Sequence, residues 1–121
     1  MQTILIIEDE KLLREMYRDK FSQEGFNTLT ASEEEEAFRV LENHNPDLIL
    51  LDILLPRGNG IEILKRLKSS NLTSKIPVIA FSNLDDLKTK TRAYELGAKK
   101  YLIKTAYTPK ELIAEVRNVL N

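Results

Sequence analysis

The chain has 121 residues, of which 42% are hydrophobic, and this size and composition fit one domain with a single core. It contains no cysteine, which excludes disulfide bonds and thiolate metal sites. The formal net charge is −1, and the basic residues are scattered without interleaved aromatic residues, so we expect no nucleic-acid partner.

No apolar run approaches the roughly 18 residues of a membrane span, and the N-terminus does not resemble a signal peptide. We therefore expect a cytoplasmic protein without membrane contact, in which residues 1–121 form one domain and leave no room for a separate output domain. The charge is unevenly distributed: residues 1–60 carry 13 acids and 6 bases, whereas residues 61–121 carry 6 acids and 12 bases. Solvated helix faces explain most of these charges.

Five short apolar segments are predicted as β-strands. Four consecutive aliphatic residues, as in Leu48–Leu51, indicate a strand buried on both faces, which is typical of the middle of a parallel sheet. The segment Phe26–Ala31 is more polar, so we place it at a sheet edge. The predicted strands are Ile4–Ile7, Phe26–Ala31, Leu48–Leu51, Ile76–Phe81 and Tyr101–Ile103.

A segment with helical periodicity follows each strand. Ser32 with Glu35 and Thr108 with Glu111 predict two capping boxes, the second with proline at the first helical position. The fourth helix has a thin apolar stripe, so we expect it to be the loosest. The predicted helices run from Leu12 to Gly25, from Ser32 through Leu41, from Ile61 to near Asn71, from Leu84 to Leu96 before Gly97, and from Thr108 to Leu120. Pro56, Gly58 and Gly60 mark a loop before the third helix.

Five strands alternating with five helices predict an α/β fold, a doubly wound five-stranded parallel sheet with right-handed crossovers and helices on both faces. Ligands of such folds bind beyond the carboxyl ends of the strands. The polar residues that directly follow strands are therefore the candidates for a site. They are Glu8, Asp9, Asp52, Ser82, Asn83 and Lys104.

Each candidate has a structural explanation when it is taken alone. Glu8 or Asp9 can stabilise the first turn of a helix, and Asp52 can form a turn. Ser82 is a suitable N-cap for the following helix, and that is the favoured reading of this residue in isolation. Lys104 alone is most simply a surface lysine. The argument for a functional site therefore depends on the group as a whole.

Taken together, these side chains suit phosphoryl chemistry. Three carboxylates at one edge of a sheet repel each other unless a cation is bound, and a hard divalent ion such as Mg²⁺ prefers such oxygen ligands. Neutralising Asp52 should then stabilise the metal-free fold. Lys104 adds a fixed positive charge and Ser82 a hydroxyl donor, which equips Asp52 to attack a phosphoryl group.

These residues and their spacings resemble the receiver domain of two-component response regulators over essentially the whole chain. The matching positions are Glu8, Asp9, Asp52, Pro56, Gly60, Ser82, Gly97, Ala98, Tyr101 and Lys104. The resemblance implies a flavodoxin-like (βα)5 fold with strand order 2-1-3-4-5, of the stand-alone type similar to single-domain chemotaxis regulators.

The resemblance also implies a role for each matching residue. Asp52 is the implied phosphoacceptor, and Ser82 and Lys104 bind the phosphoryl oxygens. Ser82 and Tyr101 form the implied conformational switch. The Mg²⁺ ligands are implied to be Glu8, Asp9, Asp52 and the backbone carbonyl of Leu54.

Four positions depart from the family pattern or tune it. Asn83 stands where the family usually has a small residue, and Thr105 where it usually has a proline after the lysine, commonly in a cis peptide. The resemblance implies that Leu54 and Leu84 flank the phosphoryl group, because the family has flanking residues at these two positions. Neither leucine can orient an attacking water, so we expect slow self-dephosphorylation.

The expected function is that of a single-domain response regulator, a phosphoacceptor switch and not a dedicated enzyme. A histidine kinase or phosphotransfer protein would phosphorylate Asp52 with Mg²⁺, and the fourth helix, fifth strand and fifth helix would contact a downstream protein target. We expect a monomer or a weak phosphorylation-dependent dimer. The alternatives are a receiver domain excised from a longer protein and a receiver-like binding module that is not phosphorylated.

Overall fold

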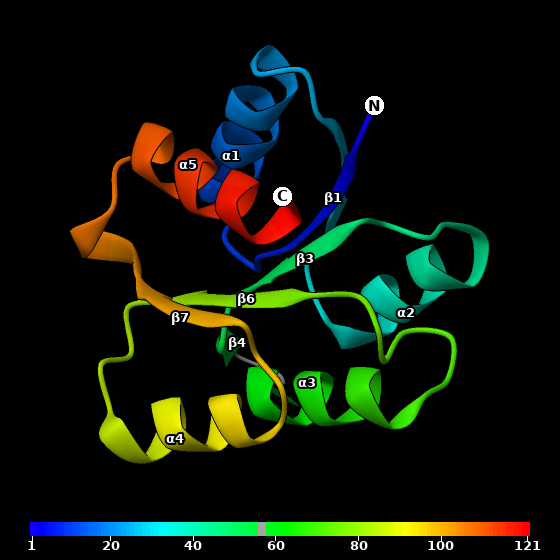
Figure 1. Ribbon diagram of the computed structural model, residues 1–121, viewed down its shortest axis with the longest axis vertical. Coiled ribbons are helices and arrows are strands. Elements are labelled where there is room, and N and C mark those ends of the chain that lie inside the picture. Colours follow the sequence, from blue (N-terminus) through cyan, green and yellow to red (C-terminus); the bar gives the residue numbers. More distant parts are fainter. Residues whose placement is uncertain (56–57) are drawn as a thin grey trace.

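Strands and helices alternate along the chain as predicted, except that two short strands, which were not predicted, lie before the third helix (Figure 1). The computed structural model describes residues 1–55 and 58–121. The strands are β1 Thr3–Ile7, β2 Asn27–Ala31, β3 Leu48–Leu51, β4 Leu54–Leu55, β5 Gly58–Asn59, β6 Val78–Ser82 and β7 Lys100–Ile103. The helices are α1 Lys11–Gln23, α2 Glu34–Asn43, α3 Gly60–Ser69, α4 Leu87–Glu95, the 3-10 turn η1 Lys104–Ala106 and α5 Pro109–Leu120.

Five of the strands form one parallel sheet in the order β2-β1-β3-β6-β7. This confirms the predicted order 2-1-3-4-5, because β4 and β5 belong to a separate antiparallel pair, in which Leu54 lies opposite Asn59. The strand order reverses between β1 and β3. In open sheets of this kind the ligand crevice lies outside the carboxyl ends of the strands at the reversal.

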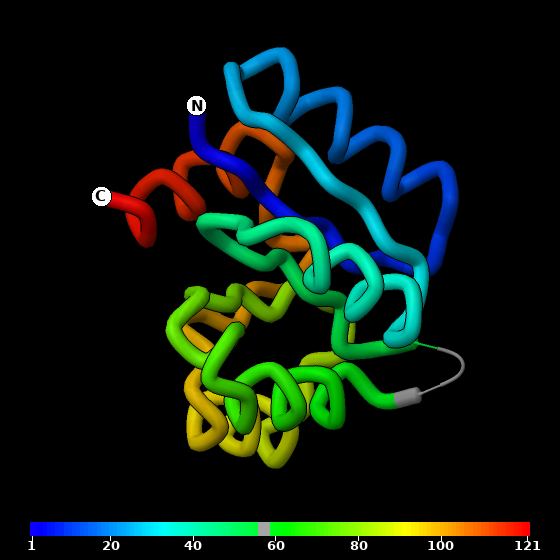
Figure 2. Tube along the Cα trace, turned by 90° about the vertical axis from the view of Figure 1, so that its right-hand side faces the viewer, coloured from blue at the N-terminus to red at the C-terminus, as the bar shows by residue number. Residues whose placement is uncertain are grey.

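Helices cover both faces of the sheet. Figures 1 and 2 show α1 and α5 on one face and α2, α3 and α4 on the other. The inner strands are apolar along their whole length because alternate residues serve two cores. In β3, for example, Ile49 and Leu51 face the α2-α3-α4 core, whereas Leu48 and Leu50 face the α1-α5 core.

Three predicted helix termini are confirmed, the C-termini of α1 and α4 and the N-terminus of α5. Gly25 and Gly97 follow α1 and α4 and adopt φ angles of 92° and 105°, a region that favours glycine. The Thr108 hydroxyl accepts a hydrogen bond from the Glu111 backbone N–H at 3.1 Å, and the Glu111 carboxylate accepts one from the Thr108 N–H at 2.9 Å. This is the predicted capping box, with Pro109 in the first turn of α5.

Two predicted helix starts are wrong. The N-cap of α2 is Glu33, so Glu36 is the residue that reaches back and accepts a hydrogen bond from the Ser32 N–H. The start of α4 is Leu87, because the Asp86 carboxylate accepts from the Thr89 N–H at 3.2 Å and caps the helix there. At α4 the Asp86 carboxylate takes the place of the predicted serine cap, whereas at α2 the N-cap residue Glu33 makes no capping hydrogen bond with its side chain.

The segments around α3 differ slightly from the prediction. Gly58 and Gly60 lie in β5 and at the start of α3, while the predicted loop residue Pro56 lies outside the described residues. The third helix ends at Ser69, two residues earlier than expected, and β6 begins at Val78. The shift in β6 follows from Pro77, which lacks an N–H but uses its carbonyl to accept from Ile49.

The acidic and basic parts of the chain lie apart in space. The acidic run at the start of α2 and the basic residues around α4 lie at opposite ends of one helical layer, with α3 between them (Figure 1). Both termini lie near the end of the sheet where β1 begins, away from the carboxyl ends of the strands. Within residues 1–55 and 58–121, no helix combines the length and apolar character needed to cross a membrane.

Candidate functional site

Asp52 lies directly after β3, where the chain leaves the sheet. Its backbone N–H still donates to the Ile7 carbonyl at 3.0 Å, and its side chain is only 6% exposed. One carboxylate oxygen, Oδ1, accepts from the Leu54 N–H at 3.0 Å. Gly60 packs so tightly against this exit that a Cβ atom there would lie 2.6 Å from the Asp52 carbonyl oxygen. The strand and the glycine together fix the position of Asp52.

Glu8 and Asp9 lie after β1, the strand next to β3. The Glu8 N–H donates to the Ala31 carbonyl at 3.0 Å, and the Glu8 residue is 3% exposed. Arg14 of α1 donates to the backbone carbonyls of Glu8 at 2.8 Å and of Asp9 at 3.2 Å. These two contacts tie the β1-α1 loop to the first helix, so the loop holds both carboxylates at the edge of the sheet.

The three carboxylates form one cluster. Glu8, Asp9 and Asp52 can each offer an oxygen such that the three oxygens lie within 4.8 Å of one another. Burial raises the pKa of Asp9 above its ordinary value of 3.8, and the neighbouring Glu8 carboxylate raises it further, while Lys104 acts in the opposite direction. The set consists of hard oxygen donors, and it fits a cation such as Mg²⁺ at the predicted residues.

Lys104 reaches into this cluster from the end of β7. Its ammonium group donates to Glu8 Oε1 and, at 3.0 Å, to Asp52 Oδ2, and only 10% of its side chain is exposed. Burial alone would lower the pKa of Lys104, but the hydrogen bonds to the two carboxylates outweigh it and raise the pKa. The lysine therefore stays charged and is no ordinary surface residue.

The peptide bond that follows Lys104 is trans. The described residues contain no cis peptide bond, and Lys104, Thr105 and Ala106 form the single 3-10 turn η1. The departure from the family pattern at Thr105 thus leaves a compact turn.

Ser82 is fully buried at the end of β6, beside β3. Its Oγ accepts a hydrogen bond from the Leu84 N–H at 3.1 Å, so it closes a local turn and does not cap α4 as predicted from the residue alone. A hydroxyl that accepts in this way still has its own proton to donate. Asn83 is exposed in the same loop.

Tyr101 lies in β7 with its ring inside the protein. It is 7% exposed, and its hydroxyl donates to the Leu84 carbonyl at 2.7 Å. Burial raises the pKa of its phenol, so the proton of this hydrogen bond is retained at neutral pH. The two predicted switch residues, Ser82 and Tyr101, therefore hold the same residue, Leu84, at its N–H and at its carbonyl.

Leu54 and Leu84 lie together next to the cluster. They line a cavity of about 270 Å³ with Leu55, Asn59 and the first turns of α3 and α4. Leu54 is 52% exposed, and its backbone N–H bonds to Asp52. Their proximity in space was predicted only from the family pattern.

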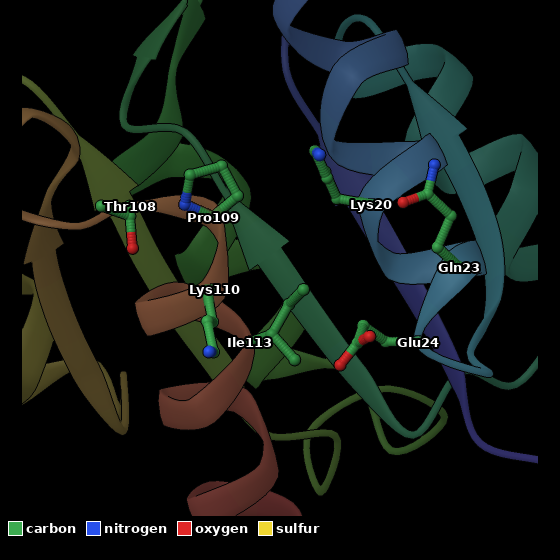
Figure 3. Close-up of a pocket in the computed structure, with 7 residues that line it drawn as sticks. All are labelled: Lys20, Gln23, Glu24, Thr108, Pro109, Lys110 and Ile113. Atoms are coloured by element: carbon green, nitrogen blue, oxygen red, sulfur yellow. The ribbon is translucent and has the colours of Figure 1, made fainter.

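A second cavity, of about 340 Å³, lies away from the cluster. Figure 3 shows it between the end of α1, which contributes Lys20, Gln23 and Glu24, and the start of α5. Its lining combines both charges with the apolar side chain of Ile113. None of the predicted site residues lines it.

The structure thus brings together all the predicted carboxylates with Lys104, and it places Ser82 on the adjacent strand end. Three supporting residues were not predicted as such. Gly60 was identified as a loop residue and as a position that matches the family, but not as a contact of Asp52, and nothing in the sequence indicated that Arg14 holds the β1-α1 loop. Tyr94 of α4 was also missed, although its hydroxyl accepts from the Tyr101 N–H at 2.9 Å.

The domain has the flavodoxin-like fold, a doubly wound α/β arrangement. It carries buried carboxylates, a lysine and a hydroxyl at the carboxyl ends of its strands. The chain belongs to the response regulator receiver domain family, whose family model matches residues 4–117. This is a family of two-component signal transduction, and its members are phosphoacceptor switch domains.

Curated relatives agree with this assignment. The chain is 39% identical over 119 residues to the phosphate regulon transcriptional regulatory protein PhoB of Pseudomonas aeruginosa, and the match covers 98% of this chain and 52% of the relative. It is 34% identical over 117 residues to the alkaline phosphatase synthesis transcriptional regulatory protein PhoP of Bacillus subtilis, covering 97% of this chain and 48% of the relative. The chain spans about half the length of these relatives.

Solved structures show the same fold. A putative response regulator from Chloroflexus aurantiacus superimposes with a TM-score of 0.88 at 31% identity, covering 98% of this chain and 97% of the other. A two-component response regulator from Clostridium difficile gives a TM-score of 0.91 at 27% identity, covering 99% and 96%. The chemotaxis protein CheY4 of Vibrio cholerae, at 22% identity, has a TM-score of 0.91 and covers 98% of both chains, which shows the fold alone.

Proposed function

We propose that this domain accepts a phosphoryl group on Asp52 from a histidine kinase or phosphotransfer protein and signals by protein contact. One observation carries the proposal: the Asp52 carboxylate lies within hydrogen-bond distance of the Lys104 ammonium and belongs to a cluster of three acids. A buried cluster of this kind costs stability, and structure alone gives no reason to retain it.

The transfer step follows from these groups. A carboxylate oxygen of Asp52 forms a bond to phosphorus while the phosphorus–nitrogen bond of the donor phosphohistidine breaks. The leaving imidazole keeps the electron pair of that bond and takes up a proton. The Lys104 ammonium and the Ser82 hydroxyl then donate to the phosphoryl oxygens, which stabilises the added negative charge.

In this proposal Mg²⁺ is held by Glu8, Asp9, Asp52 and the Leu54 backbone carbonyl. When bound, the ion compensates negative charge on the carboxylates and the phosphoryl oxygens. The chain's own residues orient that site: Arg14 fixes the loop of Glu8 and Asp9, and the Leu54 N–H fixes the Asp52 carboxylate.

The output surface in this proposal is formed by α4, β7 and α5. Its basic residues include Lys88, Lys90, Arg92, Lys99 and Lys100, of which Lys90 pairs with Asp85 and Lys100 with Glu115. Charge complementarity favours a downstream protein that presents acidic residues. Ser82 and Tyr101 link this surface to the phosphorylation site through Leu84.

The test is to expose the protein to a small phosphodonor and Mg²⁺ and to measure its mass. We expect one phosphoryl adduct in the parent protein, and none in Asp52→Asn or in the presence of a chelator. Asp19→Asn makes the same chemical change at an exposed aspartate of α1 and should be phosphorylated like the parent. An Asp52→Asn variant that gains phosphate as fast as the parent would contradict the proposal and favour a binding module.

A further inference from the structure

Tyr94 makes an uncommon contact between α4 and the edge of the sheet. β7 is the last strand of the described sheet, and its backbone bonds to β6 on its inner side. The N–H of Tyr101 in this strand donates to the Tyr94 hydroxyl of α4 at 2.9 Å. A side chain of α4 thus fixes the backbone of the predicted switch residue.

α4 buries little apolar surface. Ala93 is its buried residue, whereas its other side chains are exposed or half-buried. A helix with so little apolar burial depends on its polar contacts for its position. The Tyr94 hydroxyl makes one of these contacts, and the Tyr94 residue as a whole is 50% exposed.

The contact is the first link of a short chain of hydrogen bonds. Tyr94 holds the backbone of Tyr101, whose hydroxyl donates to the Leu84 carbonyl at 2.7 Å. The Leu84 N–H in turn donates to Ser82 Oγ at 3.1 Å. Through these bonds a residue on the outer surface fixes the rotamer of the hydroxyl at the strand end beside Asp52.

We propose that Tyr94 is a positioning residue of the switch: its hydroxyl holds Tyr101 and Leu84 in the arrangement from which the Ser82 hydroxyl donates to a phosphoryl oxygen. The inference rests on the proposed function of Asp52. Because binding depends on the fraction of molecules in the competent arrangement, loss of this hydroxyl weakens the binding of a phosphoryl group.

Beryllofluoride with Mg²⁺, a mimic of the phosphoryl group, tests the proposal. Tyr94→Phe keeps the ring and removes only the acceptor. We expect it to weaken beryllofluoride binding by up to about fivefold, the factor that one hydrogen bond of ordinary net strength controls. In the absence of the mimic, amide hydrogen exchange of Tyr101 should be faster than in the parent. Tyr107→Phe is the matched control, because Tyr107 packs in the core on the opposite side of the sheet.

A double-mutant cycle with Tyr101→Phe distinguishes an effect of Tyr94 through the Tyr101 hydroxyl from a general destabilisation of α4. If Tyr94 acts through the Tyr101 hydroxyl, adding Tyr94→Phe to Tyr101→Phe leaves the beryllofluoride affinity unchanged. The same loss in both backgrounds would overturn the proposal, as would a Tyr94→Phe variant that binds like the parent. A parent protein that does not bind beryllofluoride would overturn the proposed function itself and the inference with it.

Discussion

Asp9 is the carboxylate of the cluster whose charge is least compensated. Lys104 bonds to Glu8 and Asp52, whereas burial and the nearby Glu8 raise the pKa of Asp9. Because the pKa of Asp9 is higher in the folded than in the unfolded protein, protonated Asp9 stabilises the fold relative to charged Asp9. This contribution to the free energy of unfolding is fully present below pH 3.8, the ordinary pKa, and is lost as the pH rises through the raised pKa of the folded protein.

At pH 7, therefore, the charged Asp9 costs stability in the absence of metal. We expect Asp9→Asn to raise the Tm measured in chelator at neutral pH, and the difference from the parent to shrink as the pH falls to about 3, where the aspartate is also neutral. Asp19→Asn, at an exposed site, should have little effect at either pH. An unchanged or lower Tm for Asp9→Asn at pH 7 would count against the repulsion described here.

The structure refines the expectation for Asp52. Charge repulsion alone predicts that Asp52→Asn also stabilises the metal-free fold. The Asp52 carboxylate, however, accepts from Lys104 and from the Leu54 N–H, both at 3.0 Å. Loss of these charged bonds offsets the relief of repulsion, so the gain in Tm should be smaller than for Asp9→Asn.

Leu54 and Leu84 are expected to prolong the phosphorylated state. Both side chains line one cavity beside the site, and neither can hydrogen-bond an attacking water. A Leu54→Asn, Leu84→Gln double variant should therefore lose its phosphoryl group faster than the parent once the donor is removed. The measurement follows the phosphorylated fraction over time. Equal rates in the two proteins would show that these positions do not set the lifetime.

At the scale of elements, the close approach of α3 to the β3 exit determines where Asp52 lies. A Cβ atom at Gly60 would meet the Ile53 Cα atom at 2.5 Å, and backbone atoms at that distance cannot be avoided by a side-chain rotation. We expect Gly60→Ala to destabilise the fold by about 1–3 kcal/mol, as overpacking does, and to slow phosphorylation of Asp52.

Gly25→Ala is the matched control for this substitution. Gly25 has a φ of 92° but open space where its Cβ atom would lie, so alanine there is strained without displacing a neighbour. We expect a loss of stability of about 1–2 kcal/mol with an unchanged rate of phosphorylation. If Asp52 is phosphorylated as fast in Gly60→Ala as in Gly25→Ala, the close contact of Gly60 with the β3 exit does not position Asp52.

Local patterns predicted most of the elements, because burial and backbone strain act on neighbouring residues. The strand Leu48–Leu51 and the glycines Gly25 and Gly97 are examples. Predictions failed where two residues compete for one role, as at Ser82, where Asp86 caps the helix. Contacts between distant segments, such as Tyr94 with Tyr101, depend on how helices pack, and no local pattern encodes them.

The site was predictable for a related reason. Parallel strands end at one edge, so residues that follow different strands meet there, and Glu8, Asp52 and Lys104 do so. The hydrogen-bond partners of each side chain were not predictable. The Lys104 ammonium could have faced solvent, and only the packed structure shows that it lies between two carboxylates.

At the scale of the whole molecule, phosphorylation should change the α4 side of the sheet more than the α2 side. Leu84 precedes α4; its N–H donates to Ser82 Oγ and its carbonyl accepts from the Tyr101 hydroxyl, whereas α2 packs mainly against β2. On adding beryllofluoride and Mg²⁺, we expect the largest backbone chemical-shift changes outside the site in α4 and β7. Changes confined to α1 and α2 would contradict a route through Leu84.

The separation of charge between α2 and α4 also affects how the protein behaves during purification. A protein with a formal net charge of −1 would ordinarily bind weakly to any ion exchanger. Here the acidic run at the start of α2 and the basic residues around α4 lie at opposite ends of one helical layer. An anion exchanger can bind the protein through the acidic surface of α2, and a cation exchanger through the basic surface around α4. At low ionic strength the protein should therefore be retained on both anion and cation exchangers, and modest salt should elute it from either.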